Sequence, residues 1–296
     1  MKNWKRVTPL QNLAFIAMMA AINGALSLLL SFLPYSSFLA IIILPIINAL
    51  GVYLVDKKWF AVYVVTSTII PLLVTMFDLS TTLFYVIPSI ISGFIYGALS
   101  KLRIPACLTI LASTIWVLAS TYLSLPIIKV IYEIDMIPAV VASLNLKPFA
   151  VVLIPSFIFA FSWASTSISH FLITFTYEKI GFETTVWDWE KYVYPAASII
   201  LGTLSILLSS ISLEVTYILL AISLYFAAFS VQNLVENHSI ISIVALVILL
   251  VVAFLAFAFM YSMMAPGAGG SLISLFVIAT SISALIASFK AKPLAN

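Results

Sequence analysis

Charge is what this sequence most conspicuously lacks. Of its 296 residues, 8% are charged and 64% are hydrophobic, and the mean hydropathy is +1.24. A soluble domain carries about 25% charged residues, which cover its water-facing surface. So little charge excludes an ordinary soluble enzyme, a disordered chain and a nucleic-acid-binding protein. The solvent of this chain is therefore expected to be a lipid bilayer, and no nucleic acid is expected as a partner.

Residues that carry out chemistry are also scarce. The single cysteine, Cys107, excludes an internal disulfide and a paired-cysteine site, and the two histidines, His170 and His238, lie far apart. The chain contains no HExxH, GxxxxGK[ST] or GxSxG string. We therefore predict no catalytic residue, no metal site, no cofactor and no enzymatic activity.

Long apolar runs are abundant. A helix needs about 20 apolar residues to cross a hydrocarbon core of about 30 Å, so the runs predict an all-α, polytopic transmembrane helix bundle. Ten spans can be marked, at residues 9–33, 37–55, 59–77, 82–100, 105–123, 148–176, 192–211, 215–234, 239–264 and 270–289. The basic N-terminus resembles a signal peptide, but it lacks a convincing small-x-small cleavage site, so we interpret it as part of a retained first helix.

The basic residues predict the orientation. If the N-terminus is cytoplasmic and the spans alternate, eleven of the thirteen Lys and Arg residues face the cytoplasm, and only Lys129 and Lys147 lie outside. This is the bias of the positive-inside rule. We therefore expect both chain ends in the cytoplasm of a protein of the cell membrane.

Two segments carry too much charge to be predicted as membrane spans. Residues 124–147 are expected to form an outer surface segment or lid, because charges at the centre of a bilayer cost about 2.5–3.5 kcal/mol each. Residues 178–191 are expected to form the largest inner connection. This connection divides the chain into a six-span unit, residues 1–177, and a four-span extension, residues 192–296.

Small residues form a strip on the first span. Ala17, Ala21 and Ala25 recur at every fourth position, which keeps them on one helix face. Small residues let the backbones of membrane helices approach closely. The strip therefore predicts either packing against a neighbouring helix of this chain or docking of another membrane subunit. Gly93 and Gly97 form a GxxxG pair in the fourth span and predict close helix packing within the chain.

These features resemble the S components of energy-coupling factor (ECF) transporters. The basic N-terminus with its alanine strip resembles their first helix, and the string from Pro88 through Gly93 to Gly97 resembles their fourth-helix region. The larger S-component-like membrane proteins of unknown function match the length better. The resemblance implies that residues 1–177 bind a vitamin-like small molecule or a metal ion from outside. It also implies that Ala17, Ala21 and Ala25 dock a membrane T subunit, which works with two cytoplasmic ATPases.

On that interpretation a solute site opens outward, and the outer polar residues are its candidates. Asp78 and Thr81 lie between the third and fourth spans, and Glu133 and Asp135 lie in the outer segment. Each has a simpler interpretation. Asp78 is well placed to cap a helix N-terminus, and the two later carboxylates are suited to a solvated loop.

Polar residues within spans are rare enough to need a reason. Asn23 and Asn48 are expected to hydrogen-bond across the first helix pair. His170, in the hydroxyl-rich sixth span, is either a histidine near the inner interface or part of a proton relay or substrate path.

The expected function is therefore non-catalytic solute binding or transport together with partner subunits. Two alternatives remain: a self-contained ten-span secondary transporter, and a structural or assembly protein without a ligand. The absence of a buried acidic residue for ion coupling argues against the secondary transporter.

Overall fold

The described part of the chain is all-helical, as predicted. The computed structural model describes residues 8–32, 37–143, 151–180, 189–236 and 266–290, and no β-strand occurs in these ranges. The chain divides into two compact units. Unit 1 comprises residues 1–144 and 161–186, and unit 2 comprises residues 145–160 and 187–296. The units differ from the predicted domains in that residues 145–160 lie with unit 2.

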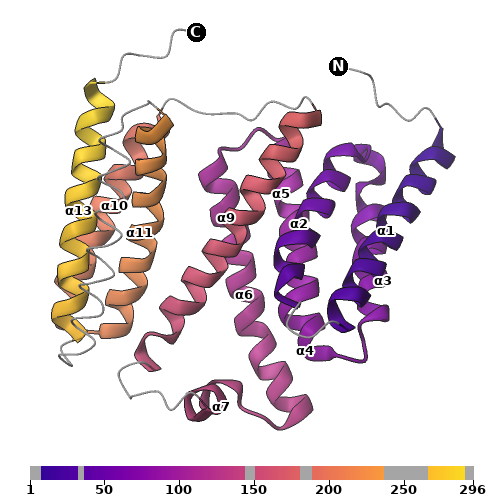
Figure 1. Ribbon diagram of the computed structural model, residues 1–296, viewed down its shortest axis with the longest axis horizontal. Coiled ribbons are helices and arrows are strands. Elements are labelled where there is room, and N and C mark those ends of the chain that lie inside the picture. Colours follow the sequence, from indigo (N-terminus) through magenta and orange to yellow (C-terminus); the bar gives the residue numbers. More distant parts are fainter. Residues whose placement is uncertain (1–7, 33–36, 144–150, 181–188, 237–265, 291–296) are drawn as a thin grey trace. The chain divides into compact units, whose positions relative to one another are not determined.

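Unit 1 is a layered helical bundle (Figure 1). In it α1 packs on α2 and α3, α2 packs on α5, and α5 packs on α6. Helix α9 begins among the residues of unit 2 and ends in unit 1. The elements are α1 (Pro9–Phe32), α2 (Ser37–Leu54), η1 (Lys57–Trp59), α3 (Phe60–Val74), α4 (Leu79–Thr81), η2 (Thr82–Val86), α5 (Ile87–Lys101), α6 (Ala106–Tyr132), α7 (Met136–Ser143) and α9 (Ile154–Ile180).

Seven helices in the described ranges are long and apolar enough to cross a membrane, and two shorter apolar helices accompany them. This is the make-up of a multi-pass membrane protein. Nine of the ten predicted spans coincide with described helices, whereas the predicted span 239–264 lies outside the described residues. The count of ten spans and the cytoplasmic position of both ends remain predictions.

The outer segment differs from its prediction. The sequence predicts that the fifth span ends at residue 123, but α6 continues through Pro126 and Lys129 to Tyr132. At 1.5 Å per residue, a helix of 27 residues is about 40 Å long and can therefore project beyond a hydrocarbon core of about 30 Å. Its charged end need not enter the bilayer, so charge alone is a poor guide to where the helix stops.

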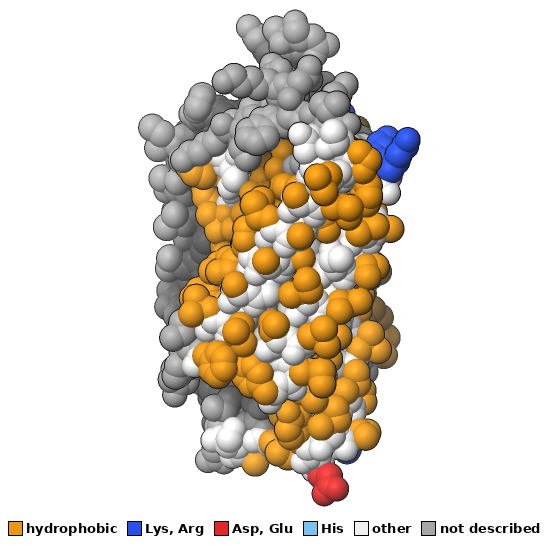
Figure 2. Space-filling model, turned by 90° about the vertical axis from the view of Figure 1, so that its right-hand side faces the viewer, with side chains coloured by type: hydrophobic (Ala, Val, Ile, Leu, Met, Phe, Trp, Pro, Cys, Tyr) orange, Lys and Arg blue, Asp and Glu red, His pale blue; other side chains and the backbone are white. Residues whose placement is uncertain are grey.

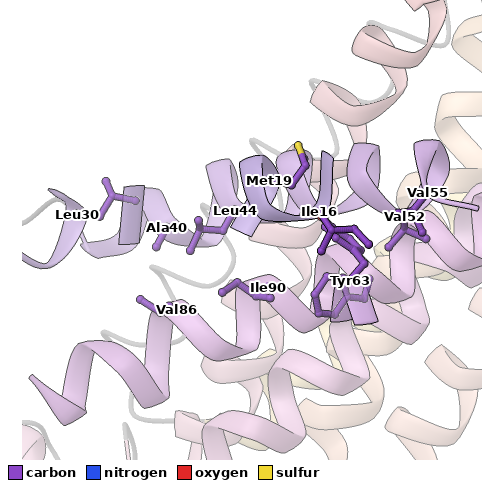
Figure 3. Close-up of a cluster of buried hydrophobic side chains, with 11 residues drawn as sticks. Ile16, Met19, Leu30, Ala40, Leu44, Val52, Val55, Tyr63, Val86 and Ile90 are labelled. Carbon is purple, nitrogen blue, oxygen red and sulfur yellow. The ribbon is translucent and has the colours of Figure 1, made fainter. Parts of the chain in front are cut away.

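The core of unit 1 lies where α1, α2, α3 and α5 meet (Figure 3). Ile16, Leu44, Tyr63 and Ile90, one from each helix, are almost completely buried. Pro45 lies inside α2 and lacks the N–H that would bond to the carbonyl of Ile41. Ser169 of α9 donates to that carbonyl instead, at 3.0 Å. The proline therefore leaves the Ile41 carbonyl able to accept a hydrogen bond that links α9 to α2.

Unit 2 contains three mutually packed helices, α10 (Glu190–Leu208), α11 (Leu213–Glu236) and α13 (Pro266–Lys290). Each helix carries buried hydroxyls at every seventh residue. They are Ser198 and Ser205 on α10, Thr216, Ser223 and Ser230 on α11, and Ser274, Ser281 and Ser288 on α13. A seven-residue repeat keeps one face of a helix against its neighbours in left-handed packing.

These hydroxyls bond across the three helices. Ser198 Oγ donates to the carbonyl of Ser223 at 2.9 Å, and Ser223 Oγ donates to the carbonyl of Ser198 at 2.8 Å. Ser281 Oγ donates to Ser198 Oγ at 2.8 Å, and Ser205 Oγ and Ser274 Oγ share a hydrogen bond of 3.0 Å. Small hydroxyl residues thus provide both close approach and polar links inside unit 2.

Candidate functional site

The predicted ligand residues Asp78 and Thr81 form a helix start. The Asp78 carboxylate accepts from the backbone N–H of Thr81 at 3.1 Å, so the predicted N-terminal cap is confirmed. Next to it, Thr82 Oγ1 lies 2.7 Å from the carbonyl of Thr75 and 2.8 Å from its hydroxyl. These polar groups are therefore engaged in holding the turn between α3 and α4.

The helix after this cap is irregular. Residues Thr82–Val86 form a π-helical turn, η2, and two side chains of α6 bond to η2 and to the start of α5. Ser124 Oγ donates to the carbonyl of Leu83 at 3.2 Å, and the Trp116 ring N–H donates to the carbonyl of Pro88 at 3.1 Å. Irregular backbone at membrane depth is tolerated where it is buried in protein or lines a polar site, and π-turns are frequent at functional sites.

The other two predicted ligand residues follow the end of α6. Asp135 forms an ion pair with Lys129 at 2.7 Å, and both side chains are about half exposed. Glu133 is exposed and ends α6 in the left-handed conformation, with φ of 58°. In Figure 1, α4, α7 and this end of α6 lie at the same end of unit 1. Of the four predicted ligand residues, however, only Asp78 and Thr81 are joined by a hydrogen bond.

The alanine strip is exposed. Ala17, Ala21 and Ala25 lie on a face of α1 that the described part of the chain leaves uncovered. The opposite face is buried by α2 and α3. No described helix covers the strip, so its surface is open to the docking alternative, and packing against another part of this chain remains the other prediction.

Gly93 and Gly97 lie directly against α2. A Cβ at residue 93 would be 2.6 Å from the carbonyl oxygen of Pro45, and one at residue 97 would be 2.7 Å from that of Ala49. Both distances are shorter than a carbon–oxygen contact allows. The two glycines therefore let the backbones of α2 and α5 approach closely.

Asn23 and Asn48 form the predicted cross-helix pair, which is confirmed. Asn23 Nδ2 donates to Asn48 Oδ1 at 2.8 Å, and Asn48 Nδ2 donates back to Asn23 Oδ1 at 3.1 Å. Asn48 Nδ2 also donates to the carbonyl of Leu44, and Tyr63 OH donates to Asn48 Oδ1. Both asparagines are fully buried. This network joins α1, α2 and α3 and leaves little free capacity for a ligand.

Two polar aromatic side chains, Tyr96 of α5 and His170 of α9, lie next to each other inside unit 1. The rings of Tyr96 and His170 are 5.2 Å apart between centroids. Tyr96 OH, His170 Nδ1, Ser113 Oγ and Ser167 Oγ are all buried without a hydrogen-bond partner among the described residues, whereas His170 Nε2 lies 3.4 Å from the Thr174 hydroxyl. Such atoms in a membrane interior are costly, by about 1–3 kcal/mol each, unless something bonds to them. Tyr96 OH and His170 Nδ1 are therefore further candidates for hydrogen bonding to a polar solute.

Glu190 corrects the expectation that no acidic residue is buried. It begins α10, has 6% of its surface exposed and accepts a hydrogen bond of 2.6 Å from Tyr194 OH. The prediction failed because the expected span begins after it, at residue 192. Glu190 is thus a buried carboxylate at the first residue of a helix long and apolar enough to cross a membrane.

Comparisons of this chain with protein-family models, with curated proteins and with solved structures found no match. Two features described above therefore carry the functional interpretation. These are an exposed strip of small residues on α1, and buried polar groups that the described part of the fold leaves without partners.

Proposed function

We propose that this chain is a non-catalytic, solute-binding subunit of the cell membrane. It resembles the substrate-specific subunit of an ECF-type transporter and takes a vitamin-like small molecule or a metal ion from outside. Its partners are a membrane T subunit and cytoplasmic ATPases. The exposure of Ala17, Ala21 and Ala25 is the observation that carries the proposal.

The two faces of α1 explain why exposure matters. Asn12, Asn23 and Ser27 lie on its buried face, so these three polar side chains are turned inward. The outer face carries the alanines between larger exposed side chains such as Met18 and Ile22. Lipid-facing positions need only be apolar, whereas three alanines in register form a flat strip on which another helix can lie closely.

Replacing Ala17, Ala21 and Ala25 together by leucine is expected to weaken partner association. Added bulk in a close helix contact costs about 1–3 kcal/mol, so roughly tenfold weaker binding or more is expected. The measurement is recovery of a T subunit and ATPases with the tagged full chain from its native membrane. Ala61→Leu, at an exposed alanine on α3, is the matched control. Unchanged recovery in the triple variant would contradict the docking role.

A self-contained secondary transporter is the second candidate, and Glu190 favours it. On this alternative the buried carboxylate carries a coupling proton or cation, and Tyr96 and His170 bind the solute in the other unit.

This alternative predicts uptake by the chain alone. Proteoliposomes under a proton gradient would be offered a panel of water-soluble vitamins, and uptake is expected to fall at least about tenfold in Glu190→Gln, because the amide cannot carry the exchangeable proton. Glu214→Gln is the matched control at another helix start. Gradient-driven uptake that survives Glu190→Gln, or no uptake at all, would exclude this mechanism. No uptake, no partner and no thermal shift with any vitamin or metal would favour a structural or assembly protein.

A further inference from the structure

Basic residues gather at one end of unit 1, where α2 ends and α5 ends. Lys57 and Lys58 begin η1 directly after α2, and Lys101 and Arg103 lie at the end of α5. Lys101 Nζ donates to the carbonyls of Val52 and Val55, at 3.2 and 2.9 Å, and thereby joins the two helix ends. All four basic side chains are exposed.

One acidic residue, Asp56, lies among the four basic residues at this end. Asp56 Oδ2 accepts from Asn12 Nδ2 at 3.0 Å. Lys101 is bound by the two carbonyls, which is a favourable place for a cation at a helix C-terminus. Among the described residues, Lys57, Lys58 and Arg103 have no ion-pair partner. The helix ends therefore carry a net excess of positive charge.

Arg103 occupies a backbone position that favours glycine. It has φ of 58°, and its N–H bonds to the carbonyl of Ser100 while the N–H of Ile104 bonds to that of Leu99. These two bonds form a Schellman motif, whose left-handed residue is usually glycine. A residue other than glycine in this left-handed conformation costs about 1 kcal/mol of folding free energy. The left-handed residue places the Arg103 side chain directly after the end of α5, two residues beyond Lys101.

The surroundings are apolar. Leu102, between Lys101 and Arg103, has 70% of its surface exposed. Figure 2 shows a largely hydrophobic face with a group of basic side chains at its upper edge. If this face lies in hydrocarbon, the cations at its end lie at the depth of the phospholipid headgroups.

We propose that Lys57, Lys58 and Arg103 form a binding site for the phosphate of an anionic phospholipid headgroup, held between the ends of α2 and α5. Lys101 fixes the spacing of the two helix ends. Exposed side chains such as Leu102 and Val62 accompany the acyl chains. Cation clusters beside spans recognise anionic lipids in this way, and each basic residue near the membrane surface strengthens binding about fivefold.

Native mass spectrometry of the full chain in detergent, titrated with phosphatidylglycerol or phosphatidylcholine, tests the site. The unmodified chain is expected to retain phosphatidylglycerol in preference to phosphatidylcholine. Arg103→Gly is expected to weaken that retention about fivefold, and Lys57→Gln with Lys58→Gln roughly 25-fold. The retention should also fall as salt is raised.

Arg103→Gly distinguishes a loss of lipid binding from a loss of folding stability. Glycine suits the left-handed position, so the melting temperature in lipid-free detergent is expected to stay the same or rise. Glu133→Gly relieves the same backbone conformation at the end of α6 and serves as the matched control, with phosphatidylglycerol retention unchanged. Equal retention of the two lipids by the unmodified chain, or full retention by Arg103→Gly, would overturn the proposal. So would displacement of the lipid by equimolar inorganic phosphate, which would indicate a soluble anion.

Discussion

Gly93→Ala is expected to destabilise the protein by about 3 kcal/mol, and the double change with Gly97→Ala is expected to prevent α5 from packing on α2. The new Cβ at residue 93 would lie 2.6 Å from the carbonyl oxygen of Pro45, 2.7 Å from Asn48 Cβ and 2.8 Å from Pro45 Cα. Two of these three atoms are backbone, so no rotamer change can relieve the contact. Alanine gains about 1 kcal/mol in helix propensity, which offsets only part of the cost.

Thermal or denaturant unfolding of the purified chain in detergent measures this effect. Gly270→Ala is the matched control, because its Cβ would lie 3.3 Å from the Thr216 methyl group, a side chain that can shift. The control is expected to change stability by less than about 1 kcal/mol. If Gly93→Ala were as mild as the control, α2 and α5 would not be in the close contact described here.

The helices were predictable because the bilayer restricts the choice of structure. A long apolar run that must satisfy its own backbone hydrogen bonds can only be a helix, or a strand of a closed barrel. Their ends were less predictable. Lys129 is too polar for the middle of a span, yet α6 extends past it, because a charge at the tip of a long helix costs little. Helix α13 is also longer than predicted, because it begins at Pro266, four residues before the predicted start at residue 270.

The side-chain roles divide along similar lines. Local roles were visible in the sequence: Asp78 caps the helix that follows it, and Asn23 and Asn48 needed partners inside the membrane. Roles that depend on which helix lies opposite the residue were not visible in the sequence. Ala17 and Gly93 carry the same small-residue signal, but one is exposed and the other packed against α2. Spacing defines a helix face and does not specify what covers it.

The hydroxyl repeats of unit 2 are a signal that the sequence contains and that the span-by-span interpretation missed. Ser274, Ser281 and Ser288 follow one another at seven-residue intervals, as do Thr216 and Ser223. Taken singly, a hydroxyl in a helix can bond to its own backbone, as Ser274 and Ser288 do. A search for seven-residue repeats of small polar residues would have identified the shared interface of α10, α11 and α13.

Asn48→Leu is expected to destabilise the protein by about 3 kcal/mol, and Asn23→Leu by about half as much. Leucine keeps the branched shape of asparagine but removes both the donor and the acceptor. Loss of Asn48 leaves the Asn23 amide and Tyr63 OH without these partners, and both side chains are fully buried. Loss of Asn23 leaves Asn48 with its bonds to Leu44 and Tyr63.

The double variant measures the interaction between Asn23 and Asn48 separately from their other contacts. Removing both amides leaves only Tyr63 OH to find a new partner, so the double variant is expected to be less destabilised than the sum of the single variants, by about 1–2 kcal/mol. Hydrogen bonds between membrane helices average about 0.6 kcal/mol. This pair should exceed that average, because it is reciprocal and shares a third partner from α3. Additive single effects, measured by unfolding in detergent, would show that the two asparagines do not bond across α1 and α2.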